Sequence, residues 1–140
     1  MKKVKGGKTI GEKLKCSPVK CEVASVILWS RDLKKSVDLY SKLLGLPIEE
    51  KDNFRTLHIF RLSNGLEIMI DSNGMNKIPV PQSASPLFFM PADDIDKAAD
   101  YVHDLGFEII YGGIHRNHAV SFFNMRDEDF NVITICQKHK

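Results

Sequence analysis

The spacing of hydrophobic residues alternates between the strand period and the helix period along the chain. A β-rich apolar run over residues 21–29 leads to Asp32, a residue type that caps helices well. From Leu33, apolar residues recur at i, i+4, i+7 and i+11, which predicts an amphipathic helix that ends before Gly45. Turn-forming residues separate the extended runs that follow, which predict strands over 46–51, 56–62 and 66–71.

The same order of elements starts again after a linker rich in turn formers, residues 72–86. A strand is predicted over 87–90, and a helix with one apolar stripe follows Asp94 and ends before Gly106. Further strands are predicted over 107–111, 119–125 and 132–136. We therefore expect two related modules, 22–72 and 84–138, that pair in a single domain over residues 21–140, because each is small for a stable core. Each helix should cover one face of its strands and leave the other free for a ligand.

Composition and charge narrow the location and the partners. Of the 140 residues, 43% are apolar and 27% charged, which is an ordinary globular composition. No apolar run approaches the ~20 residues of a membrane span and no hydrophobic signal region follows the first lysines, so we expect a cytoplasmic protein without membrane contact. Residues 1–20 hold seven lysines and one glutamate, which predicts a basic, flexible leader. The leader lacks arginine and aromatic residues, so we expect no nucleic-acid partner.

The three cysteines give no sign of a structural framework. Cys16, Cys21 and Cys136 have neither C-x-x-C spacing nor the Cys/His spacing of a zinc site. We expect reduced thiols, since an unpaired cysteine is commonly a small buried hydrophobe.

One segment carries a resemblance to a known family. Residues 26–40 (VILWSRDLKKSVDLY) resemble the first strand and helix of the vicinal oxygen chelate superfamily, which includes glyoxalase I, extradiol dioxygenases and the bleomycin- and fosfomycin-resistance proteins. Residues 43–46, 105–108 and 126–133 continue the likeness, which spans residues 22–137. It implies an α+β fold in which two tandem βαβββ modules form a curved, mostly antiparallel sheet around an open cavity, with the helices outside.

The resemblance also implies where a metal would lie. Metal-dependent members use two positions from each module, and these fall on Ser25, Glu67, Leu87 and Thr134. Only Glu67 is a normal ligand, because leucine cannot coordinate and neutral hydroxyls bind divalent metals poorly without carboxylate or imidazole neighbours. We therefore expect no metal and no other cofactor.

Side chains two positions apart on a strand share a face, so the former metal positions predict the lining of the cavity. The predicted lining is Ser25, Ile27, Trp29, Glu67, Met69, Leu87, Phe89, Thr134 and Cys136. His58 and Phe60, and Val120 and Phe122, join it if their strands have the matching parity.

Several of these residues have two interpretations. Trp29 is either a flat wall for a planar or cationic ligand or a core aromatic residue. Glu67 either bonds across the sheet, or holds a cation or acts as a base. His115 and His118 follow a Gly-Gly pair and are predicted in a surface turn, as are the acids of residues 127–129.

Three functions fit this pattern. The first is metal-free binding of a small organic ligand, cationic or planar, similar to the drug-sequestering branch of the family, for which the resemblance implies a homodimer. The second is a lyase, isomerase or dioxygenase-type enzyme with a displaced metal site or with Glu67 as base. The third is an accessory domain without a ligand.

Overall fold

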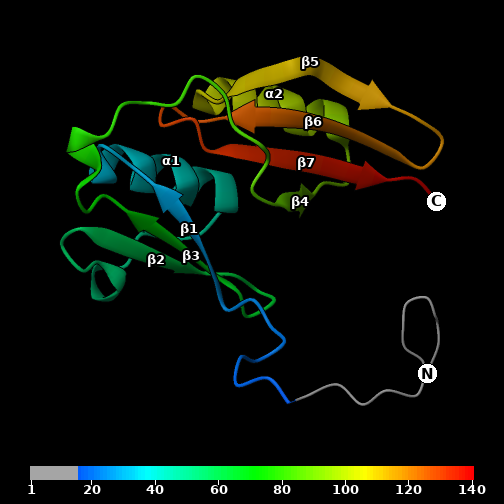
Figure 1. Ribbon diagram of the computed structural model, residues 1–140. Helices are drawn as coiled ribbons and strands as arrows, with labels where there is room; N and C mark the ends of the chain where they lie inside the picture. Colours follow the sequence, from blue (N-terminus) through cyan, green and yellow to red (C-terminus); the bar gives the residue numbers. More distant parts are fainter. Residues whose placement is uncertain (1–15) are drawn as a thin grey trace.

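The computed structural model describes residues 16–140, which form two related halves (Figure 1). The first half comprises β1 (Ser25–Trp29), α1 (Leu33–Leu44), the 3-10 helix η1 (Glu50–Asp52), β2 (Leu57–Arg61) and β3 (Glu67–Asp71). After the 3-10 helix η2 (Met75–Lys77), the second half comprises β4 (Phe89–Pro91), α2 (Ile95–Leu105), β5 (Glu108–Arg116), β6 (Val120–Arg126) and β7 (Val132–Lys138). The α+β fold class is confirmed.

Most of the predicted leader, residues 1–15, lies outside the described part of the chain. Within that part, no helix has both the length and the apolar character needed to cross a membrane.

Both α-helices begin and end at the residues that the sequence marks. Asp32 accepts a hydrogen bond from the backbone N–H of Lys35 at 3.2 Å, and Asp94 caps α2 in the same way. The helices end at Gly45 and Gly106, with φ of 67° and 109°, a region that glycine adopts without a Cβ clash. Local capping thus fixes where each helix meets its strands.

The strands form two mixed sheets, ordered β1–β3–β2 and β4–β7–β6–β5. The pairs β1/β3 and β4/β7 are parallel and the other neighbours are antiparallel. The predicted strand over 46–51 is wrong, because these residues form coil and the start of η1. Pro47 has no N–H for a sheet, and the charged run 49–52 offers no alternating apolar face. The first sheet therefore has three strands and the second has four.

The helices and the inner faces of both sheets share one hydrophobic core. Its helical members include Val37 and Tyr40 from α1 and Ile95, Ala99 and Val102 from α2. The ring of Tyr40 meets that of Phe107 edge-on at 5.6 Å, and the hydroxyl of Tyr101 donates to the carbonyl of Lys42 at 2.9 Å. The halves thus join through their helical sides, and the opposite face of each sheet lies outside the core.

The linker between the halves crosses the outer face of the second sheet. The hydroxyl of Tyr111 in β5 accepts from the backbone N–H of Ala84 at 3.2 Å and donates to its carbonyl at 2.8 Å. At the other edge of the sheet, the N–H of Leu87 donates to the carbonyl of Val132 at 2.8 Å, so the Tyr111 side chain and residues 84–87 together cover the ~14 Å between the edge strands, at ~4.8 Å per neighbouring pair. Because α2 covers the inner face, this crossing segment runs over the outer one (Figure 1).

Candidate functional site

The outer face of the first sheet carries three cross-strand rows of side chains. In the order β1, β3, β2 the rows are Ser25, Glu67 and Arg61; Ile27, Met69 and Ile59; and Trp29, Asp71 and Leu57. Neighbours within a row lie ~5 Å apart. The face therefore has a polar end, an apolar middle and an end where an indole lies beside a carboxylate.

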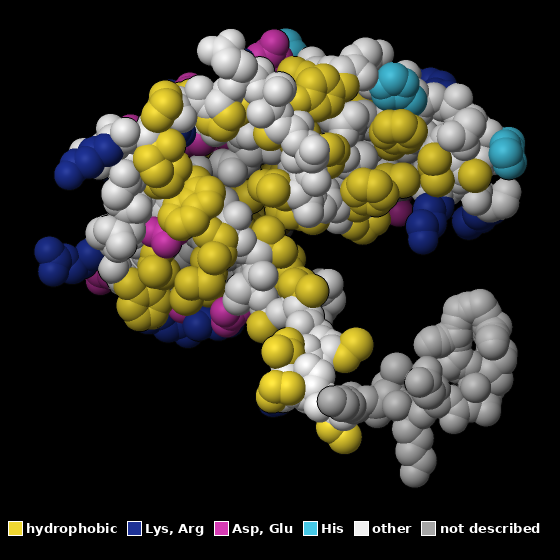
Figure 2. All heavy atoms as spheres, in the orientation of Figure 1, with side chains coloured by type: hydrophobic (Ala, Val, Ile, Leu, Met, Phe, Trp, Pro, Cys, Tyr) yellow, Lys and Arg dark blue, Asp and Glu magenta, His cyan; other side chains and the backbone are white. Residues whose placement is uncertain are grey.

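This outer face is apolar and open in the single chain. Ile27 is 46% exposed and Trp29 is 43% exposed, so Trp29 is not a core residue. Figure 2 shows hydrophobic side chains gathered over the region of β1 to β3, with acidic side chains among them. Exposed apolar patches of this kind are typical of surfaces that bind a partner or ligand.

The outer face of the second sheet is partly covered. Its rows are Phe89, Thr134, Asn124 and Ile110, and then Pro91, Cys136, Phe122 and His115. Thr134 is only 3% exposed and donates to Oδ1 of Asn124 at 2.6 Å, on the face that the crossing segment traverses. Leu87 and Phe89, at 50% and 69% exposed, remain accessible at the edge. Thr134 is therefore part of a buried polar pair rather than an open wall.

The strand register shows which residues of β2 and β6 face outward, a question that the sequence left open. His58 pairs with Ile70, and Phe60 with Ile68, so both lie on the inner face and the expectation that they line the cavity is wrong. Leu57, Ile59 and Arg61 occupy the outer face instead. Phe122 pairs with Cys136, so Val120 and Phe122 have the predicted outer parity.

His115 also differs from its predicted position in a surface turn. It lies in β5, and its ring stacks on Phe122 with 5.0 Å between centroids. The longer strand includes a bulge, because residues 111–114 stand opposite Phe123 alone. Tyr111, Gly112 and Gly113 all have positive φ there, and this turns the Tyr111 side chain toward Ala84.

Glu67 is held by neighbours on its own face. Its Oε2 lies 3.5 Å from Nε of Arg61, and Ser25 donates to Oε1 at 3.4 Å. Both oxygens of the carboxylate therefore have a partner on the same face of the sheet. These contacts favour the cross-sheet interpretation of Glu67 over the role of a free base.

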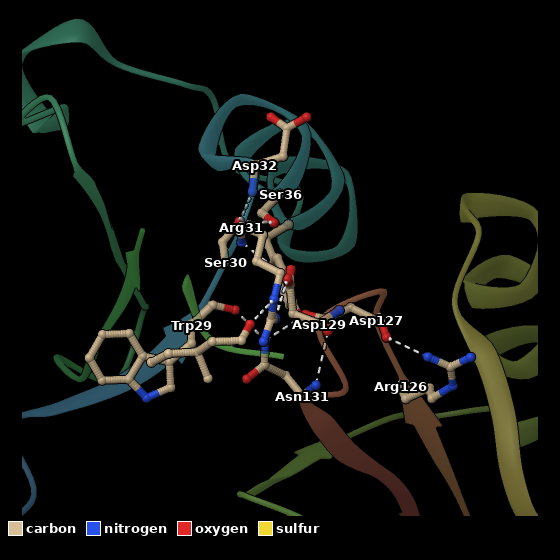
Figure 3. A network of polar contacts seen from close by, with 11 residues as sticks. Trp29, Ser30, Arg31, Asp32, Ser36, Arg126, Asp127, Asp129 and Asn131 are labelled. Carbon is tan, nitrogen blue, oxygen red and sulfur yellow. Dashed lines mark hydrogen bonds and ion pairs between the residues drawn. The ribbon is translucent and has the colours of Figure 1, made fainter. Parts of the chain in front are cut away.

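A buried polar network links the end of β1 to the turn between β6 and β7 (Figure 3). Asp127 is 4% exposed and accepts from the hydroxyl of Tyr40 at 2.6 Å. It also accepts from the backbone and side-chain N–H groups of Asn131, both at 2.9 Å. Nδ2 of Asn131 donates in turn to the carbonyl of Trp29 at 2.8 Å. The network thereby fixes the backbone that carries Trp29.

Arg31 and Asp129 extend this network to the start of α1. The backbone N–H and the guanidinium of Arg31 reach Oδ1 of Asp129 at 3.0 and 2.9 Å. The prediction that residues 127–129 form a turn is correct, but it missed that Asp127 and Asp129 are anchors. The Asp-x-Asp-x-Asn spacing over 127–131 is the signal that could have found them.

The titration of the buried pair follows from its surroundings. Burial raises the pKa of Asp127, while the hydrogen bonds from Tyr40 and Asn131 act in the opposite direction. Burial, and then the charge of Asp127, raise the pKa of Tyr40 well above its ordinary value. At neutral pH the hydroxyl of Tyr40 is therefore protonated and donates to Asp127.

Two hollows of the chain lie away from the middle of either outer face. One, of about 410 Å³, lies between α1 and the β6–β7 turn and is lined by acidic and basic side chains. The other, of about 580 Å³, is apolar and lies beside the edges of β1 and β4. Neither hollow is lined by Ile27, Trp29 or Met69 of the first outer face.

Two paired modules, each with a helix on one sheet face and the other face free, define a known class of protein. Comparison with known families identifies this class. The family model of the Glyoxalase/Bleomycin resistance protein/Dioxygenase superfamily matches residues 22–135, so the chain belongs to this superfamily. Among curated proteins, none matches the chain.

Solved structures show the same fold at low identity. A glyoxalase/bleomycin resistance protein/dioxygenase family enzyme from Burkholderia phytofirmans PsJN is similar, with a TM-score of 0.67 and 14% identity over 83% of this chain and 98% of that chain. Lactoylglutathione lyase from Agrobacterium tumefaciens has a TM-score of 0.60 and 16% identity over 85% and 95%. TioX from Micromonospora sp. ML1 has a TM-score of 0.59 and 14% identity over 84% and 99%. These likenesses concern the fold alone.

The metal positions that the family implies do not fit a metal here. Glu67 is engaged by Arg61, Thr134 is buried against Asn124, and Leu87 has no donor atom. In the described part of the chain, no group of three or more histidine, cysteine, aspartate or glutamate side chains is arranged to hold a metal ion. No step of the proposed function therefore runs through a metal.

His58 is a titratable side chain in the hydrophobic core, and its burial makes the free energy of unfolding depend on pH. It is 1% exposed, and neither ring nitrogen has a hydrogen-bond partner in the described part of the chain. Burial lowers the pKa of His58 below 6.5, with Asp52 acting in the opposite direction. As the pH falls through 6.5, the unfolded chain takes up a proton that the folded chain resists, so stability present above this pH declines below it.

We expect His58→Leu to raise the free energy of unfolding at pH 7.5 by about 1 kcal/mol, because it removes unpaired buried polar atoms. The same substitution should also reduce the loss of unfolding free energy between pH 7 and pH 5, which urea unfolding at each pH measures. His103→Leu, at an exposed position on α2, is the control and should retain the decline. An unchanged slope in His58→Leu would contradict this assignment.

The bonds between Tyr111 and Ala84 predict how the crossing segment is held. Tyr111→Phe removes both, at a cost of about 1 kcal/mol, and should increase hydrogen exchange at the amide of Ala84. Exchange mass spectrometry of the peptide over residues 79–88 measures this. Tyr101→Phe, which loses only its bond to Lys42, should leave that peptide unchanged. Equal exchange in wild type and Tyr111→Phe would mean that another contact holds the segment.

Proposed function

We propose that this chain is a metal-free small-molecule-binding protein that acts as a homodimer in the cytoplasm, with its ligand held against the outer face of the first sheet. The observation that carries the proposal is the open apolar face, on which Ile27 and Trp29 remain 46% and 43% exposed in the single chain. Full burial of an exposed apolar side chain contributes about 1.5–3 kcal/mol, and about half of that remains to be gained at each of these half-buried residues by ligand binding or association.

Dimerisation and ligand binding are linked in this proposal, because a second chain would cover the open sheet face on which the ligand lies. The outer faces are sheet surfaces without a roof in one chain, and ligand sites bury most of the surface of a small molecule. In a dimer whose outer faces meet, Ile27, Trp29 and Met69 of the first sheet line the enclosed space. Leu87 and Phe89 join them where the second sheet of the partner lies opposite. The superfamily name includes bleomycin resistance proteins, so sequestration of an organic compound is consistent with the fold.

The test is an unbiased search for a bound compound. Native mass spectrometry of freshly purified protein should show a dimer that carries an organic ligand, and thermal shift with planar and cationic compounds should find stabilising members. A monomer with no bound compound and no stabilising member in the panel would contradict the proposal.

Elemental analysis of the same preparation, made without chelator, separates binding from metal-dependent catalysis. About one equivalent of nickel, zinc, iron or manganese per chain would favour the enzyme alternative. A metal-free preparation that retains the compound unchanged over hours supports sequestration.

A further inference from the structure

The two carboxylates on the outer face of the first sheet differ in what surrounds them. Glu67 lies 3.5 Å from the guanidinium of Arg61, a cationic partner that it shares with Asp52. Within residues 16–140, the carboxylate of Asp71 accepts one hydrogen bond, from the backbone N–H of Asn73 at 2.9 Å, and has no ion pair with lysine or arginine. The uncompensated negative charge of this face is therefore at Asp71.

Asp71 shares its row with the only tryptophan. Trp29 in β1 and Asp71 in β3 are direct register partners, so their side chains stand side by side on the outer face. The face of an indole attracts cations through its quadrupole, and a carboxylate beside it adds a full negative charge. The two groups together favour a positive charge held between them.

The backbone under this pair is fixed before any ligand arrives. The N–H of Ser30 donates to the carbonyl of Asp71 at 3.0 Å, and the carbonyl of Trp29 accepts from Asn131 at 2.8 Å. A pair held on paired strands loses little conformational freedom on binding, so its contacts translate into affinity.

The rest of the face sets the direction of the ligand. The apolar row of Ile27, Met69 and Ile59 lies next to the Trp29 row and suits an aromatic or aliphatic body. In the row ~13 Å from Asp71 along the strand, the carboxylate of Glu67 already has Arg61 as its cationic partner. A positive group therefore belongs at the Trp29 end.

We propose that Trp29 and Asp71 form a recognition site for an organic cation, an amine or quaternary ammonium group carried on an apolar body. This inference rests on the proposed function and names the ligand class of that same face. In this proposal the acid that binds the positive group of the ligand is Asp71, and not Glu67 as the sequence suggested.

The experiment compares a phenylbutyl trimethylammonium ion with its uncharged tert-butyl isostere on the full chain. Calorimetry measures affinity, and fluorescence of Trp29 reports contact with the indole. Wild type should prefer the cation by about tenfold or more, and Asp71→Asn should remove most of that preference. Asparagine retains the acceptor for the N–H of Asn73, so the turn is preserved. Glu67→Gln is the matched control and should keep the preference, while Trp29→Leu should weaken cation binding.

The outcomes separate this inference from the proposed function. If both probes bind wild type equally, or if Glu67→Gln rather than Asp71→Asn removes the preference, cation recognition at Asp71 is wrong while ligand binding stands. If neither probe binds but neutral compounds of the thermal-shift panel do, the ligand class is likewise wrong. If no compound binds and none co-purifies, the proposed function fails as well.

Discussion

Replacing Asp127 with alanine is expected to lower the free energy of unfolding by about 3 kcal/mol or more. The carboxylate is 4% exposed and accepts hydrogen bonds from Tyr40 and Asn131, so its removal leaves buried donors without partners. Tyr40 lies on α1, whereas Asp127 and Asn131 belong to the β6–β7 turn. The network is thus a polar link between the halves, and its loss should weaken both together.

Glu128→Ala is the matched control in the same turn. Glu128 is 72% exposed and pairs with Lys35 on the surface, so its removal should leave the stability almost unchanged. Tyr40→Phe, which removes a single hydroxyl, should fall between the two. Urea unfolding, followed by Trp29 fluorescence and by circular dichroism, measures all three. Equal stability of Asp127→Ala and Glu128→Ala would rule out the network as a link.

The elements that could be predicted from sequence are those with local signals. Asp32 and Asp94 cap their helices, and Gly45 and Gly106 end them, because each needs only the residues within one turn. The strand predicted over 46–51 failed because two apolar residues, Leu46 and Ile48, on either side of Pro47 and followed by a charged run do not outweigh the absence of a partner strand.

The parity of β2 could not be predicted for a different physical reason. Leu57, His58, Ile59 and Phe60 put a large hydrophobic or aromatic group on both faces, so the alternation does not identify the inner one. Pairing with β3 decides it, and this contact depends on the register of both strands. The contact between the linker and β5 is equally non-local, since it joins Ala84 to Tyr111.

The position of Asp71 on the outer face could have been predicted from the sequence. It follows Glu67 and Met69 at the same two-residue interval, so the alternation that predicted those two also places Asp71 on the outer face. What the sequence could not provide is the difference between the two acids, because Arg61 reaches Glu67 only through the pairing of β2 with β3.

The largest effect expected on assembly comes from a charge on the outer face. If two copies meet through this face, Ile27→Glu buries an unpaired carboxylate in the interface and should weaken the dimer by at least about tenfold, or about 1.4 kcal/mol. Ile48→Glu is the matched control, because Ile48 is 48% exposed, as Ile27 is 46% exposed, but lies in the coil before η1.

Analytical ultracentrifugation across a concentration series measures the association of wild type and both variants. Wild type and Ile48→Glu should sediment as dimers at concentrations at which Ile27→Glu is a monomer with an unchanged circular dichroism spectrum. Phe89→Glu, on the second sheet, distinguishes the two possible contacts: it disrupts the dimer only if the second outer face also meets the partner, whereas Ile27→Glu disrupts it whichever outer face lies opposite. A wild-type chain that remains monomeric at high concentration would contradict the dimer, and the ligand would then have to bind an outer face open to solvent.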